Sequence, residues 1–382
     1  MRRLTVAWVL VLLALPALVY AGEPRVRALA AGDRRLLPDD DGNIQEFPNR
    51  LSEHHRIVIH NIAPPGSGSS PGIVDPAVDS DSWGEASWEM WGGTVQWAVN
   101  RPTFSRLHQD ANDPPGGAPP AHGIIDFGWA NDTWGFLAHV GTASQEVAAS
   151  SGTGTESERN TMLDFTWGTN TSSGMEFAVD FSMSSFGALD QGDQSKSAIG
   201  IGADLRNPVD MPFMNHWVAS GFYFKDSKAD TSSANDAPTT LGVDLTLFKY
   251  EQAGMMAGGP ADDFTYLLAI GVGIISEDSG IAGDDRSTTL QLPAVTAGAE
   301  YDVTDWLAIR GSVTRTFEFV FQKDNNSSEA TDILTTVGAG AHWGRFSLDA
   351  VLNNQLLEDG PNFIGGRDPG IANFVSATYG WD

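Results

Sequence analysis

Strict alternation of apolar and polar residues is the feature that most constrains how this chain can fold. In the stretch MEFAVDFSM, Met175, Phe177, Val179, Phe181 and Met183 fall on one side of an extended chain, and the residues between them fall on the other. Such a period of two is typical of a β-strand with one apolar and one polar face. No competing helical period of 3.6 occurs from residue 90 to the end.

The alternating runs repeat, and the links between them are alternately short and long. We count fourteen runs, over residues 91–99, 123–129, 133–141, 159–168, 175–183, 197–205, 215–225, 239–250, 264–276, 288–302, 305–320, 333–343, 345–353 and 371–381. Short and long links on an antiparallel meander place all short turns at one end. The pattern therefore predicts an all-β, transmembrane, antiparallel up-and-down β-barrel of about 14 strands, in which 91–99 pairs with 371–381.

Tryptophan and tyrosine positions give an independent indication. In this topology a set of aromatic residues lies beside the short turns, namely Trp129, Trp134, Trp167, Trp217, Tyr301, Trp306, Trp343 and Trp381. Aromatic rings of this kind concentrate where membrane lipid meets water. They predict a membrane-interface girdle. A secreted soluble β-sandwich or solenoid shares the alternation, but it gives no reason for this clustering.

The last strand, IANFVSATYGWD, resembles the terminal strand of bacterial outer-membrane β-barrel proteins, a porin-like class whose C-terminal segment the barrel-assembly machinery reads. Family members usually end on the aromatic residue itself, whereas here Asp382 follows Trp381. The layout of strands plus an N-terminal extension is also similar to that of the outer-membrane long-chain fatty-acid transporters, in which the extension plugs the lumen. Their Asn-Pro-Ala triplet is absent here.

The N-terminal part divides into two segments. Residues 1–21 combine Arg2 and Arg3, an apolar run and small residues before Ala21, which predicts a signal peptide cleaved on export to the bacterial outer membrane. Residues 22–85 are rich in Pro, Gly, Ser and Asp, which predicts an irregular extension able to plug the lumen. Its one apolar run, HRIVIHNI, is expected to stay out of the barrel wall, which we place at 86–382.

Polar faces of the expected strands supply the candidate site residues. Acidic residues expected to line the lumen are Asp126, Asp164, Glu176, Asp180, Asp204, Asp244, Glu300, Glu318 and Asp349, against one basic residue expected there, Arg310. Glycine pairs such as Gly338 and Gly340 lie on the same faces. They leave room for a packed plug or allow the strands to curve.

Several functional classes find no support. The chain has no cysteine, and its formal net charge of −27 disfavours a nucleic-acid partner. No catalytic motif occurs, so we expect no enzyme activity and no cofactor. His54, His55 and His60 are close in sequence, but no acidic residue stands at ligand spacing, and we assign no metal site.

The sequence thus predicts an outer-membrane porin for passive passage of small solutes, cation-preferring because its lumen is acidic. Outer-membrane lipid, the barrel-assembly machinery and small solutes are the expected partners, and the oligomeric state stays open. Two alternatives remain. One is a plugged transporter of hydrophobic compounds, and the other is a structural or adhesive barrel that presents its outer loops.

Overall fold

A computed structural model describes most of the expected strands and parts of the N-terminal extension. The described residues are 23–30, 41–60, 83–99, 122–148, 155–188, 195–226, 238–253, 264–278, 286–322, 328–352 and 372–381. The expected signal peptide, residues 1–21, lies outside these ranges and stays a prediction. Within the described ranges, no helix is both long enough and apolar enough to cross a membrane.

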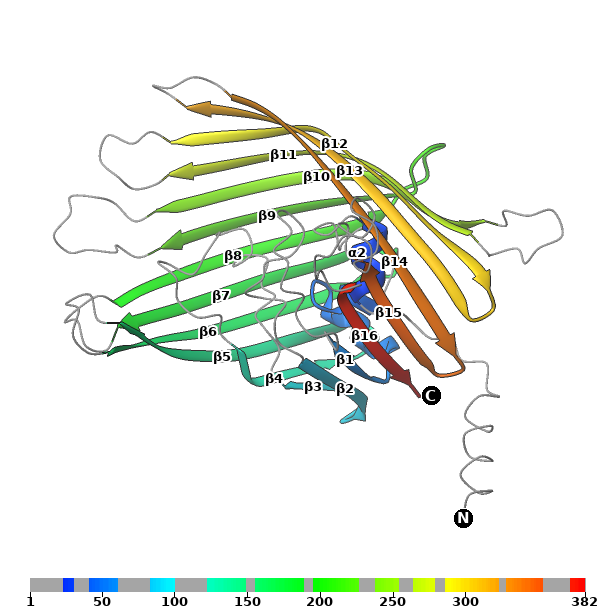
Figure 1. Ribbon diagram of the computed structural model, residues 1–382, viewed down its shortest axis with the longest axis horizontal. Helices are drawn as coiled ribbons and strands as arrows, with labels where there is room; N and C mark the ends of the chain where they lie inside the picture. The colour runs from blue at the N-terminus through cyan, green and yellow to red at the C-terminus, as the bar shows by residue number, and fades with distance from the viewer. Residues whose placement is uncertain are drawn as a thin grey trace, which may run out of the picture.

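Within the described residues, sixteen strands form a single closed antiparallel barrel (Figure 1). Each strand pairs with its neighbours in sequence, and β1 closes the ring by pairing with β16. The strands are β1 (Arg56–His60), β2 (Trp83–Met90), β3 (Gly93–Val99), β4 (His122–Ala130), β5 (Trp134–Ala148), β6 (Thr155–Asn170), β7 (Glu176–Ala188), β8 (Ser195–Pro208), β9 (His216–Asp226), β10 (Thr239–Ala253), β11 (Phe264–Asp278), β12 (Ser287–Thr304), β13 (Leu307–Gln322), β14 (Ser328–Trp343), β15 (Phe346–Leu352) and β16 (Ala372–Gly380).

The predicted class is confirmed, but the predicted number of about 14 strands is wrong. The extra strands are β1 and β2, and both begin before residue 86. Ile57 and Ile59 of HRIVIHNI are 46% and 49% exposed on the outer side, while Val58 between them is buried. This run is therefore a wall strand, contrary to the prediction, and the wall begins at Arg56.

The expected pairing of 91–99 with 371–381 is wrong for the same reason. Arg56 of β1 lies opposite Gly380 of β16, and β3 pairs instead with β2 and β4. A tight turn at Trp91 and Gly92, both with positive φ (56° and 72°), joins β2 to β3. Glycine adopts such φ values without strain, and the Trp-Gly-Gly stretch marks this turn.

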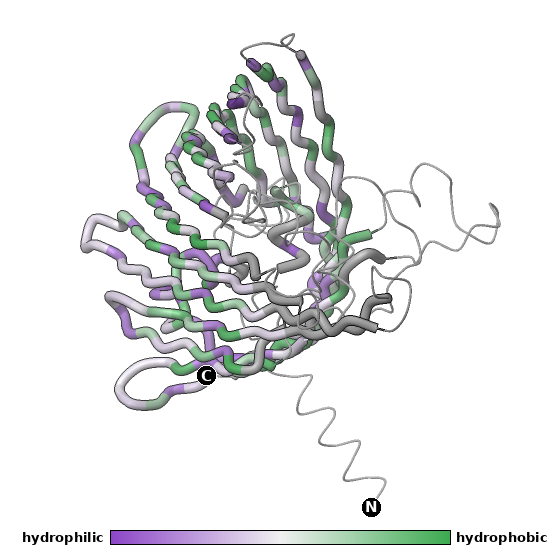
Figure 2. Tube along the Cα trace, turned by 90° about the vertical axis from the view of Figure 1, so that its left-hand side faces the viewer, coloured by the Kyte–Doolittle hydropathy of each residue, from purple (hydrophilic) through white to green (hydrophobic). Residues whose placement is uncertain are grey.

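Hydrophobic and hydrophilic residues alternate along many of the strands (Figure 2). Because successive side chains of a strand point to opposite faces, this alternation separates apolar from polar side chains. On β7, Phe181 and Met183 are exposed while Ser182 is buried. On β10, Leu241 and Val243 are both more than half exposed. A contiguous apolar exterior of this kind is unfavourable in water and suits a lipid environment.

The described short turns join strands at one end of the barrel, which we call the short-turn end. They comprise residues 91–92, 131–133, 171–175, 209–215, 305–306 and 344–345. Several predicted girdle residues lie in contact there, with ring centroids of Trp129 and Trp134 4.8 Å apart and those of Trp306 and Trp343 6.2 Å apart. Their role at a membrane interface stays a prediction.

Candidate functional site

Part of the N-terminal extension packs inside the barrel. Its described residues include helix α2 (Glu23–Ala30) and two short 3-10 helices, η1 (Asp41–Ile44) and η2 (Pro48–Glu53), so the extension is not irregular throughout, contrary to the prediction. Helix α2 packs against β12 to β16, whereas η2 packs against β3 to β6 on another arc of the wall. Because η1 contacts both α2 and η2, these elements reach across the lumen (Figure 1). We call residues 23–30 and 41–53, which contain α2, η1 and η2, the inner segment.

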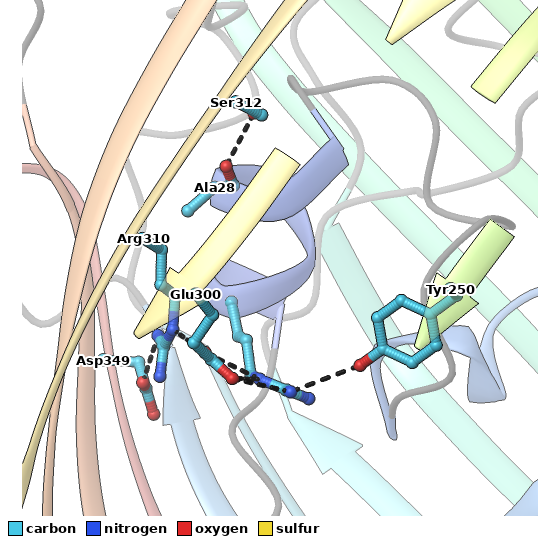
Figure 3. Close-up of polar contacts among 7 residues, drawn as sticks. Ala28, Tyr250, Glu300, Arg310, Ser312 and Asp349 are labelled. Atoms are coloured by element: carbon cyan, nitrogen blue, oxygen red, sulfur yellow. Dashed lines mark hydrogen bonds and ion pairs between the residues drawn. The ribbon is translucent and has the colours of Figure 1, made fainter. Parts of the chain in front are cut away.

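A cluster of four charges fixes helix α2 to the wall (Figure 3). The Arg25 guanidinium donates to Glu300 through Nε (3.0 Å to Oε2) and Nη2 (2.8 Å to Oε1), and Nη2 also donates to the Tyr250 hydroxyl at 3.3 Å. Arg310 donates to the same Glu300 carboxylate and, at 2.5 Å, to Asp349. The two positive and two negative charges balance, which is what burial of such groups requires.

The C-terminal end of α2 is attached to the wall through a backbone carbonyl group. The carbonyl oxygen of Ala28 accepts hydrogen bonds from Ser312 Oγ at 2.6 Å and Thr336 Oγ1 at 3.2 Å, so that a carbonyl left open at a helix end is satisfied by the wall. Glycine makes this approach feasible. A Cβ on Gly338 would lie 2.7 Å from the Cβ of Ala28.

On the opposite arc, a bidentate ion pair fixes η2. Arg50 Nε lies 2.6 Å from Glu176 Oε1, and Arg50 Nη2 lies 2.7 Å from Glu176 Oε2. Arg206 approaches the same carboxylate at 3.5 Å. Paired parallel bonds of this type are among the stronger hydrogen bonds in proteins. A Cβ on Gly168 would lie 2.8 Å from the Pro48 ring, so this glycine also makes room for η2.

Apolar contacts complete the packing of the inner segment. Phe47 and Ala30 join a buried cluster with Val218, Phe248 and Leu267 of the wall. A second buried cluster consists of Ile44, Leu51, Ala130 and Leu137. The inner segment therefore contacts the wall in two ways, through apolar side chains in these clusters and through ion pairs at Glu300 and Glu176.

Further polar contacts lie on the inner side of β1 to β7. Arg56 Nη2 donates to Glu85 at 2.7 Å, and Gln96 donates to the same carboxylate at 2.5 Å. His139 Nδ1 lies 3.1 Å from Asp126 Oδ2. Asp164 accepts a hydrogen bond from Ser182.

The nine predicted lumen acids differ in their surroundings. Asp126, Glu176, Asp204, Glu300 and Asp349 are buried, while the other four are half-buried, namely Asp164, Asp180, Asp244 and Glu318. Glu318 accepts a hydrogen bond from Gln291 at 2.8 Å. The structure brings together Glu300, Arg310 and Asp349 in one cluster and leaves Glu176 and Asp126 in separate ones.

Sequence reasoning missed four arginines on the inner side. Arg56 and Arg206 belong to the wall, and Arg25 and Arg50 belong to the inner segment. The expected ratio of nine acids to one arginine is therefore incomplete, and several acids are compensated. Arg206 stands two residues after Asp204 and shares its face, so alternation alone could have identified it.

Among the residues that the structure describes, no group of three or more histidines and carboxylates is placed to hold a metal ion. Comparison with known proteins finds no matching family model and no matching curated protein.

Solved structures similar to this chain include a double mutant of the Serratia marcescens hemophore receptor HasR in complex with its hemophore HasA and heme. It is 12% identical, with a TM-score of 0.36, over 75% of this chain and 52% of that chain. The copper transporter OprC is 10% identical, with a TM-score of 0.36, over 75% of this chain and 51% of that chain. This chain thus spans about half the length of these two proteins. The barrel architecture itself rests on the strand pairing described above.

Proposed function

We propose that this chain is a transport barrel of the bacterial outer membrane whose lumen is closed at the short-turn end by the inner segment. The observation that carries the proposal is the attachment of this segment to two arcs of the wall. Glu300 is paired with Arg25 at one arc, and Glu176 is paired with Arg50 at the other. Both acids lie close to short turns, Glu300 near the end of β12 and Glu176 at the start of β7.

The membrane location is supported by the exterior. Closed barrels satisfy every backbone hydrogen bond between strands, and the exposed apolar side chains face outward. The expected signal peptide and the C-terminal strand are consistent with export and with insertion by the barrel-assembly machinery. Outer-membrane lipid and small solutes are the proposed partners.

Passive porin activity requires the inner segment to move or to leave a gap beside it. Its ion pairs and buried apolar contacts oppose such movement, so we expect low basal conductance. Compensation of Glu176, Glu300 and Asp349 by arginines also lowers the expected preference for cations. The remaining half-buried acids would give a cation preference only in an open state.

Conductance of the full chain in planar bilayers tests this proposal. The change Arg50→Glu places two carboxylates side by side at η2, and we expect higher conductance and faster uptake of small sugars by proteoliposomes. The swapped variant Arg50→Glu/Glu176→Arg restores opposite charges and is expected to return conductance towards the wild-type level. High conductance in the wild type, unchanged in both variants, would contradict closure by the inner segment.

A second candidate, transport of hydrophobic compounds, is favoured by one feature of the wall. Ala198 of β8 and Phe222 and Phe224 of β9 form a buried apolar cluster on the inner side, farther from the short turns than the inner segment. Most neighbouring inward positions are small or polar. Binding of a fluorescent apolar probe to the wild type, with weaker binding to Phe222→Asn/Phe224→Asn, would support this candidate. Equal binding to both would exclude this cluster as the site.

A further inference from the structure

The wall residues that hold Arg25 form a site shaped for a guanidinium group. The Arg25 guanidinium approaches Glu300 side-on, with Nε 3.0 Å from Oε2 and Nη2 2.8 Å from Oε1, and Nη2 also donates to the Tyr250 hydroxyl at 3.3 Å. Two parallel bonds of this kind recognise a planar guanidinium better than a compact ammonium group. We call Glu300, Tyr250, Arg310 and Asp349, the wall side of this cluster, the arginine seat.

Without Arg25, the residues of the arginine seat carry one negative charge in excess. Glu300 and Asp349 contribute two negative charges, and Arg310, which pairs with both, contributes one positive charge. These three side chains are at most 10% exposed, so water screens the excess weakly. A buried charge needs a partner of opposite sign. The seat therefore requires one cation, and helix α2 supplies it only while the helix is attached to the wall.

Further acceptors lie next to the arginine seat on β15 and β16. Across these strands Ser347 pairs with Thr378, and Asp349 pairs with Ser376. All four residues are at most 3% exposed. Within the part of the chain that the structure describes, the three hydroxyl groups and Asp349 Oδ2 have no hydrogen-bond partner, although most buried polar groups have one. These oxygens are therefore available to the N–H or O–H groups of a solute bound at the seat.

We infer that the arginine seat is a binding site for a solute that carries a guanidinium group, and that this solute displaces Arg25 when it binds. Arg25 is then an internal competitor, which holds α2 on the wall while the solute is absent. Bound solute removes the ion pair of the helix and so favours release of the inner segment. This coupling rests on the proposed closure of the lumen, to which it adds a substrate class, whereas the binding site rests only on the charges and contacts of the seat.

Calorimetry on the full chain in detergent tests the site, with methylguanidinium as the probe. Arg25→Met should bind the probe at least about tenfold more tightly than the wild type, because Arg25 occupies the seat in most wild-type molecules. Adding Glu300→Gln to Arg25→Met removes the excess charge and should weaken binding at least about a hundredfold. Adding Glu318→Gln instead is the matched control. It makes the same chemical change at a half-buried inner acid farther along β13, and it should leave the affinity unchanged.

Two other solutes separate shape from charge. Methylammonium has the same charge without the planar fork, and methylurea has a similar planar shape without the charge. Both should bind Arg25→Met at least about tenfold more weakly than methylguanidinium does. Tyr250→Phe, again combined with Arg25→Met, is a milder change to the seat than Glu300→Gln. It removes one acceptor and should weaken methylguanidinium binding about two- to tenfold.

In the wild type, saturating methylguanidinium should speed hydrogen exchange in α2 about as much as Arg25→Met does, and methylammonium at equal concentration should not. Equal weakening by Glu300→Gln and Glu318→Gln, or no binding to Arg25→Met, would overturn the inference. Binding to the wild type without faster exchange in α2 would also overturn it, because the probe would then bind beside Arg25 rather than in its place. High wild-type conductance that Arg50→Glu leaves unchanged would refute closure but not the site, since the calorimetry does not require a closed lumen.

Discussion

Removing the negative charge of Glu300 should release helix α2 more than removing the positive charge of Arg25 does. Glu300 accepts hydrogen bonds from Arg25 and Arg310, and Asp349 completes a cluster with no net charge. In Glu300→Gln, two guanidinium groups share a single carboxylate. In Arg25→Met one negative charge is in excess, but it lies within the wall, where Glu300 and Asp349 both keep Arg310 as a partner, and helix α2 no longer carries a charge into the cluster.

The magnitudes follow from burial. The side chains of Arg25 and Glu300 are only 12% and 10% exposed, so solvent screens their pair weakly. Breaking a buried pair so that one charge is uncompensated costs about 3–5 kcal/mol. Losing hydrogen bonds to a charged group that remains paired costs about 1.5–3 kcal/mol. At about 1.4 kcal/mol per factor of ten, Glu300→Gln should favour release of α2 about 150- to 4,000-fold, and Arg25→Met about 10- to 150-fold.

Hydrogen exchange followed by mass spectrometry measures both changes, because amides of α2 exchange when the helix leaves the wall. Peptides covering η2 provide an internal control, since Glu176 and Arg50 are untouched in both variants. Faster exchange in Arg25→Met than in Glu300→Gln would refute the charge-balance argument. Unchanged exchange of α2 in both variants would show that the cluster does not hold the helix.

Three further outcomes are expected. Gly298→Ala should speed hydrogen exchange in α2, because a Cβ there would overlap the carbonyl oxygen of Leu29, whereas Gly221→Ala, with no atom nearer than 3.7 Å, should leave it unchanged. Arg56→Met should lower the unfolding temperature of the barrel, measured by circular dichroism, because Glu85 would lose a buried partner next to the β1 closure. The last outcome concerns a variant in which the inner segment is released and the lumen conducts. Its reversal potential in a salt gradient should shift towards zero when four acids are neutralised together, namely Asp164, Glu176, Asp180 and Asp244.

The closed barrel could be predicted because its cause is local. Alternation with period two decides which side chains face outward, and it needs no knowledge of partners far away in the sequence. The exposed Phe181 beside the buried Ser182 on β7 shows the rule at work. Link lengths added the antiparallel order, which the pairing reproduces strand by strand from β3 to β16.

The two missed strands show where local rules fail. β1 contains only five residues, too few for alternation to stand out from a stretch rich in Pro, Gly and Ser. β2 and β3 are separated only by Trp91 and Gly92, so the turn was included in the start of one run. Both strands are short in the described part of the chain, and short strands carry little signal per segment.

Charge balance inside the lumen could be predicted only in part, because it depends on contacts between distant residues. Arg206 lies on the inner face by alternation, and counting along β8 identifies it. Arg25 and Arg50 carry no such signal, since the helices on which they lie, α2 with eight residues and η2 with six, are too short to show a period in the sequence. Yet these two arginines compensate Glu300 and Glu176, with which they form ion pairs. An acidic lumen read from strands alone therefore overstates the negative charge that a solute meets, and most strongly at the short-turn end, where the inner segment supplies the opposite charges.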